Sequence, residues 1–173
     1  MDRQSTIWIP ATRVWIPIGA ALFTVALIVS ALIVPQLRLL HLLQALIYVA
    51  VVILARHDSM WGVGAGFTIA VVWNSLNLFV THNMQRGAAV LWSFLRTGEM
   101  RELLQAPAGT LPGLVPVMVL LGGIGHFILI AGCFAALMDR RVKQKRLWKL
   151  IAGGALVLAY MALIVIATGG GPR

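Results

Sequence analysis

The sequence predicts an all-α fold, a polytopic membrane helix bundle with five transmembrane helices and short interfacial helices between the third and the fourth. Three observations predict this fold. The chain is 60% hydrophobic and only 11% charged, and its mean hydropathy is +0.92, well outside the range of soluble globular domains. Apolar runs recur at the length of about 20 residues that a helix needs to cross a bilayer. Lys and Arg lie mostly in short segments beside those runs, where they set membrane topology.

Four of the predicted spans are long apolar runs, at residues 14–34, 62–80, 114–138 and 148–168. The fifth, residues 37–55, has polar side chains near its start, but its second part, Ala45–Ala55, carries no charge. Arg38 can reach the headgroups by extending its stem. Only Pro35 and Gln36 join the first two spans, so these form a tight antiparallel hairpin. Residues 1–173 then make up a single integral membrane domain.

The first span is predicted to be a retained signal anchor. It follows Arg3 and Arg13, it is longer than the ~7 to 15 residue core of a cleaved signal peptide, and no clear cleavage site follows it. Pro17 is expected in the first turn of this helix, where its missing amide hydrogen costs little.

The distribution of basic residues predicts the orientation. One side of the bundle collects nine Lys and Arg and the other five, and the richer side faces the cytoplasm under the positive-inside rule. The N-terminus is therefore predicted inside and the C-terminus outside, and we expect the bacterial cytoplasmic membrane. Trp15, Trp61 and Trp148 then share the cytoplasmic interface, as aromatic belts do.

Residues 81–113 form the one sizeable segment between spans, and they are predicted to lie outside the membrane. The second half of residues 88–105 carries four charges, each costing ~2.5 to 3.5 kcal/mol at the centre of a span, so a sixth span is not predicted. Thr97 and Gly98 divide this stretch into two short helices. The second has apolar residues at i, i+3 and i+4, which suits a helix lying in the interface.

Polar side chains inside the spans are the candidate ligand-binding residues, because such groups are costly in lipid. They follow helical spacing on the second and third spans, with one more on the fourth. The candidates are His41, Gln44, Tyr48, Asn74, Asn77 and His126. A rise of about 1.5 Å per residue places them in the same outer half of the bilayer. Two interpretations stay open: hydrogen bonds that hold helices together, or a small pocket open to the outside.

A metal or haem site is an alternative use of the histidines, with His41, His82 and His126 as candidate ligands. Such a site needs at least two imidazoles that face each other at one depth. His126 lies deeper than the other two, and His57 is on the cytoplasmic side. No histidine pair has the i, i+4 spacing of a helical metal motif. The cofactor therefore remains unknown, with haem or a metal as an alternative.

Two further features predict contacts with lipid or with partner chains. Gly62 and Gly66 form a GxxxG motif, which lets helix backbones approach closely. The basic segment between the last two spans is expected to bind anionic lipid or an acidic partner; its cations are Arg140, Arg141, Lys143, Lys145, Arg146 and Lys149. The single cysteine, Cys133, excludes a disulfide within one chain and is expected to be a small apolar filler.

Several functional classes lack their sequence signature. No Asp or Glu lies inside a predicted span, so a carboxylate proton relay is not predicted. The chain has no phosphate loop, nucleophile elbow or zinc-protease helix, and no basic and aromatic module for nucleic acid.

The sequence favours a non-enzymatic protein that acts by binding, as an accessory subunit of a larger membrane complex, with other membrane chains or copies of itself as partners. A small-ligand, metal- or haem-binding protein is one alternative, and an oligomeric channel or transporter is another.

Overall fold

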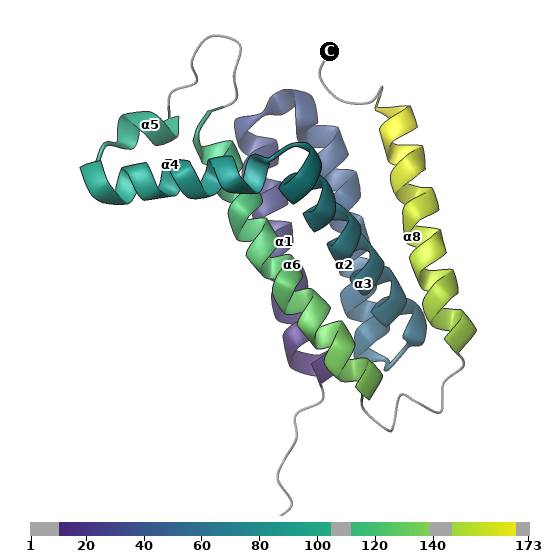
Figure 1. Cartoon of the computed structure of the whole chain (residues 1–173). Coiled ribbons are helices and arrows are strands. Elements are labelled where there is room, and N and C mark those ends of the chain that lie inside the picture. The colour runs from purple at the N-terminus through teal and green to yellow at the C-terminus, as the bar shows by residue number, and fades with distance from the viewer. Residues whose placement is uncertain (1–10, 105–111, 139–146, 169–173) are drawn as a thin grey trace, which may run out of the picture.

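The described part of the chain has five long helices, which form the body of the molecule (Figure 1). The structure, a computed structural model, describes residues 11–104, 112–138 and 147–168, and within these ranges it contains helices and no strands. The long helices are α1 (Ala11–Ile33), α2 (Arg38–Arg56), α3 (Met60–Ser75), α6 (Leu114–Met138) and α8 (Leu147–Ala167). With the short turns that extend α2 and α3, all five are long and apolar enough to cross a membrane.

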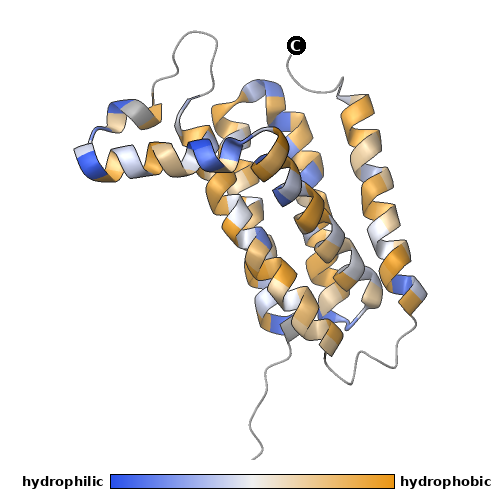
Figure 2. Cartoon of the chain, in the orientation of Figure 1, coloured by the Kyte–Doolittle hydropathy of each residue, from blue (hydrophilic) through white to orange (hydrophobic). Residues whose placement is uncertain are grey.

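The chain is therefore an integral membrane helical protein, and the predicted fold is confirmed. Apolar residues cover the long helices, and hydrophilic residues gather toward their ends and on α4 (Figure 2). The predicted boundaries lie close to the observed ones. One detail is wrong: α1 begins at Ala11, before the predicted span, so Pro17 lies inside the helix instead of in its first turn.

Four of the five helices close into a ring, in which α1 packs on α6, α6 on α3, α3 on α2, and α2 on α1. The fifth helix, α8, stands outside this ring and packs mainly on α3, with a smaller contact to α2. The most apolar windows of α1, α3 and α6 are 44%, 44% and 39% buried, whereas those of α2 and α8 are only 17% and 22% buried. Much of α2 and α8 is therefore left for lipid or a partner.

Close backbone contacts hold the ring together. A Cβ atom added to Gly19 of α1 would lie 2.6 Å from the carbonyl oxygen of Gly125 and from the amide nitrogen of Leu129, both on α6. Side chains at these positions would force the two helices apart, so glycine is required there. The η1 turn (Pro35–Leu37) joins α1 to α2 directly, which confirms the predicted hairpin.

The predicted GxxxG motif packs inside the chain. A Cβ atom on Gly62 would meet Leu54 and the backbone of Ala55 on α2, and one on Gly66 would meet Val51 of α2 and the Sγ atom of Cys133 on α6. Both glycines are buried. Their close approach thus serves the ring itself. Cys133 is fully buried in the same core, as expected of an apolar filler.

A helical arm, which we define as α4 (Asn83–Thr97) and α5 (Met100–Leu104), lies across one end of the bundle. The arm projects sideways beyond the ring (Figure 1). Gly98 adopts φ +70°, and its N–H donates to the Phe94 carbonyl at 2.8 Å, which ends α4. The predicted division at Thr97 and Gly98 is confirmed, although α4 begins earlier than expected.

Candidate functional site

His126 of α6 lies at the centre of the ring and has no exposed surface. Its Nε2 atom is 2.7 Å from the hydroxyl oxygen of Tyr48 on α2. Its Nδ1 atom is 3.2 Å from the Oδ1 atom of Asn74 on α3. Both neighbours are themselves buried. One imidazole therefore links three helices through a continuous chain of hydrogen bonds.

Which group donates and which accepts in these two hydrogen bonds follows from which atoms carry protons. The Oδ1 atom of Asn74 can only accept, so the proton of the imidazole is on Nδ1. In the neutral ring Nε2 then has a lone pair and accepts from the hydroxyl of Tyr48. The order is Tyr48 to His126 to Asn74, with each group donating to the next. A neutral imidazole with both nitrogens paired is the form that an apolar interior tolerates.

Aromatic rings enclose the imidazole. Phe23 of α1 stacks on it with ring centroids 3.8 Å apart and an interplanar angle of 15°, and Trp73 of α3 meets it edge-on at 4.9 Å. Phe23 also contacts the rings of Tyr48 and Trp73. We call Phe23, Tyr48, Trp73, Asn74 and His126 the His126 cluster. Because its members come from α1, α2, α3 and α6, every helix of the ring contributes to it.

One buried polar atom of the cluster remains without a partner among the described residues, the Nδ2 atom of Asn74. A Cβ atom added to Gly123 of α6 would lie 3.7 Å from the Oδ1 atom of Asn74 and would clash with the terminal methyl of Met84. Met84 is buried and belongs to the arm. The root of the arm thus packs beside the cluster, at the side where Asn74 meets α6.

His41 and Gln44 lie next to the cluster instead of within it. Together with Ser30 they supply the polar lining of a small cavity of about 50 Å³, and Phe23 and Trp73 form a wall that the cavity shares with the cluster. The Nδ1 atom of His41 is buried and has no partner among the described residues. The volume suffices for a few molecules of the size of water.

Asn77 is separated from Asn74 by a change in helix type. The η2 turn (Leu76–Val80) is a π-helix in which the Thr81 N–H donates to the Leu76 carbonyl at 2.9 Å. A π turn has more residues per turn than an α-helix, so the regular spacing that places residues on one face is lost. Asn77 instead donates to the Trp73 carbonyl at 3.0 Å and accepts from Thr81 at 3.2 Å.

The fold does not bring the candidate metal ligands, His41, His82 and His126, together into one site. Both nitrogens of His126 are engaged, and His82 is an exposed residue with φ +55° in the turn before α4. Among the described residues there is no group of three or more His, Cys, Asp and Glu placed to hold a metal ion. Of the basic segment only Lys149 is described; residues 139–146, with Arg140, Arg141, Lys143, Lys145 and Arg146, lie outside the described residues.

Phe23 and Trp73 were not predicted as site residues. Trp73 directly precedes Asn74, and this position next to a polar intramembrane residue could have identified it as a site residue. Phe23 gives no such signal, because it is one apolar residue among many in its span. The π turn was also missed, since no residue pattern in residues 76–80 marks it.

Comparison with protein-family models, with curated proteins and with solved structures finds no match to this chain. The fold and the His126 cluster therefore define the class of protein on their own: an integral membrane helical protein with buried, hydrogen-bonded polar side chains and stacked aromatic rings at the centre of a four-helix ring.

The Tyr48→Phe variant tests the hydrogen-bond chain. We expect this substitution to lower the free energy of unfolding by about 1 to 3 kcal/mol, because it leaves the Nε2 atom of His126 buried without a donor. The measurement is equilibrium unfolding in mixed detergent micelles. Tyr160→Phe is the matched control, because the Tyr160 hydroxyl donates to the Leu43 carbonyl at 3.3 Å in a half-buried position. Equal losses in the two variants would contradict the assignment.

Proposed function

We propose that the chain acts by binding, as an accessory subunit that contacts another membrane protein through the arm. The observation that carries this proposal is the sideways projection of α4 and α5 beyond the ring (Figure 1). Four large apolar side chains are more than half exposed on the arm, and they are Trp92, Leu95, Met100 and Leu104. Nothing else in the described part of the chain covers them.

The root of the arm is fixed, which supports a role in docking. A Cβ atom on Gly87 of α4 would clash with the carbonyl of Pro116 on α6, so the two backbones are in close contact there. Met84, also on α4, is buried and lies against Gly123 of α6. An arm held this way presents its apolar face at a set position, and pre-organisation of this kind lowers the entropic cost of binding.

The hydrogen-bonded pair at the centre of the His126 cluster is itself enclosed. The polar atoms of His126 and Tyr48 bond to one another and are enclosed by aromatic rings. A group of this kind holds helices in register and is closed to a substrate. The proposal therefore assigns stability to the core and binding to the periphery.

Site-specific photocrosslinking in native membranes tests the proposal. With a photoreactive phenylalanine in place of Trp92 or Leu95, we expect the same protein adduct of defined mass from both positions. The matched control is Leu32 at the end of α1, which is 69% exposed and lies outside the arm. We expect lipid adducts alone from Leu32. The proposal fails when neither arm position gives a protein adduct, or when Leu32 gives the same one.

A second candidate function is the binding of a small polar molecule in the cavity beside the cluster. It is favoured by the unpartnered Nδ1 atom of His41, which faces no acceptor or donor among the described residues, and by the polar lining that Ser30 and Gln44 add. Groups kept for a ligand are commonly unsatisfied and lower the stability of the empty protein. The size of the cavity restricts the ligand to molecules similar to water.

The His41→Leu variant tests this second function. We expect it to raise the free energy of unfolding by about 1 to 3 kcal/mol, because a buried nitrogen without a partner is replaced by an apolar group. Equilibrium unfolding in micelles measures the change, with Gln44→Leu as a second variant in the same cavity. A loss of stability in His41→Leu would show that the imidazole is bonded as part of the packing and would remove this candidate.

A further inference from the structure

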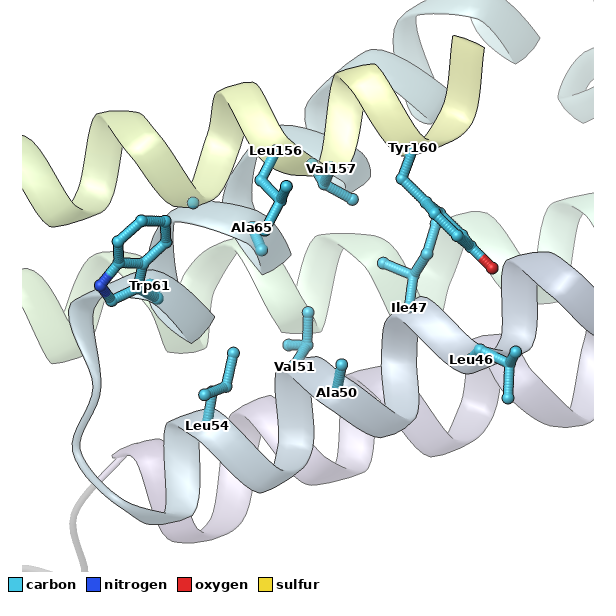
Figure 3. Close-up of a pocket in the computed structure, with 11 residues that line it drawn as sticks. Leu46, Ile47, Ala50, Val51, Leu54, Trp61, Ala65, Leu156, Val157 and Tyr160 are labelled. Carbon is cyan, nitrogen blue, oxygen red and sulfur yellow. The ribbon is translucent and has the colours of Figure 1, made fainter. Parts of the chain in front are cut away.

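A groove separates α2 from α8 on the face that is least buried. Its volume is about 370 Å³, within the range of about 300 to 1,000 Å³ that small-molecule sites occupy. It is lined by side chains of α2, α3 and α8, namely Leu46, Ile47, Ala50, Val51, Leu54, Trp61, Ala65, Gly153, Leu156, Val157 and Tyr160. Figure 3 shows α2 and α8 on opposite sides of it, with Trp61 and Tyr160 toward its two ends.

One end of the groove is basic and aromatic. Lys149, Gly153, Leu156 and Tyr160 recur at i, i+4, i+7 and i+11, which places Lys149 on the face of α8 that lines the groove. The Nζ atom of Lys149 is 5.9 Å from the centre of the Trp148 ring, and that ring contacts Trp61 edge-on at 5.7 Å. Tryptophan and lysine at the start of a span are typical of the membrane interface.

The other end is closed. The Tyr160 hydroxyl donates to the Leu43 carbonyl at 3.3 Å and so bridges α8 and α2. From Lys149 to Tyr160 the helix rises about 16 Å at 1.5 Å per residue. This is about half of a hydrocarbon core of roughly 30 Å. The groove therefore begins at one interface and ends near the bilayer centre, which is the depth that one acyl chain reaches.

We propose that this groove holds one acyl chain of an anionic phospholipid whose headgroup binds Lys149. The acyl chain gains little free energy from leaving the surrounding lipid, because lipid tails are as apolar as the groove. It fills space that the side chains leave empty and so restores van der Waals contacts. Selection then comes from the headgroup, through the charge of Lys149 near the membrane surface.

The charges at this end of the bundle agree with an anionic headgroup. Arg56, the last residue of α2, is an exposed cation at the same end of the bundle and is outside the residues that line the groove. Asp58 accepts a hydrogen bond from the Thr12 hydroxyl at 3.1 Å, on the side of α1. That hydrogen bond ties the carboxylate to α1, which packs mainly on α6 and α2, whereas α8 packs mainly on α3.

Native mass spectrometry of the full chain in mild detergent tests the proposal, with dioleoyl phosphatidylglycerol and dioleoyl phosphatidylcholine as probes. We expect one phosphatidylglycerol to bind about fivefold more tightly than phosphatidylcholine, the effect of one cation near an anionic group. Lys149→Gln should remove this preference. Equal affinity of the two lipids for the wild-type chain would overturn the proposal.

A groove-filling variant separates this site from lipid bound elsewhere on the protein. Ala50→Phe should abolish binding of the phosphatidylglycerol, because Ala50 lines the groove. Ala21→Phe is the matched control, since Ala21 is exposed on α1 away from the lining residues, and it should bind as the wild type does. Leu46→Trp fills the same groove and replaces Ala50→Phe if that variant does not fold. Binding that survives the filling variants would overturn the proposal.

The same spectra test a rival occupant. If the groove holds a second copy of the chain, the wild type gives a dimer that Ala50→Phe converts to a monomer, and this outcome would also overturn the lipid assignment. A monomer that carries one phosphatidylglycerol in the wild type and none in Ala50→Phe supports it.

Discussion

The pairing of both nitrogens of His126 is the constraint on which the ring of helices depends. An imidazole that is fully buried in an apolar bundle must find a donor and an acceptor within its own surroundings, because neither water nor lipid can supply them. The donor is Tyr48 on α2 and the acceptor is Asn74 on α3. Loss of either partner leaves a buried polar atom unsatisfied, so α2 and α3 are held at fixed positions relative to α6.

A rigid centre leaves the periphery free to bind. Phe23 ties α1 to the same imidazole by stacking, and close glycine contacts seat α1 on α6. Outside this ring lie α8, with its groove toward α2, and the arm, which meets the ring at Met84 and Gly87. The proposed partner and the proposed lipid use these two different surfaces. The two proposals therefore share the ring as a scaffold and are otherwise independent.

Much of the fold could be predicted from the sequence, because a bilayer admits few solutions. Apolar runs, together with the positions of the basic residues and tryptophans, predicted the five spans, and Gly98 predicted the division of the arm. Tyr48, Asn74 and His126 were identified as candidates because polar groups at that depth need partners. Their convergence with Phe23 depends on the rotation of each helix about its axis. The π turn after Ser75, which interrupts the regular spacing between Asn74 and Asn77, has no signature in the residues. Side-chain packing between helices decides how each helix is rotated. The apolar pattern of a membrane protein does not reveal this packing, because residues that face lipid are apolar as well.

The protonation of His126 tests the central claim most directly. Nitrogen-15 NMR of the chain labelled in its histidine side chains distinguishes the two ring nitrogens, and a His126→Phe variant identifies the signals of this residue. The hydrogen-bond chain predicts a neutral ring with its proton on Nδ1 and a hydrogen-bonded, unprotonated Nε2. A ring protonated on Nε2, or an imidazolium with protons on both nitrogens, would contradict the account.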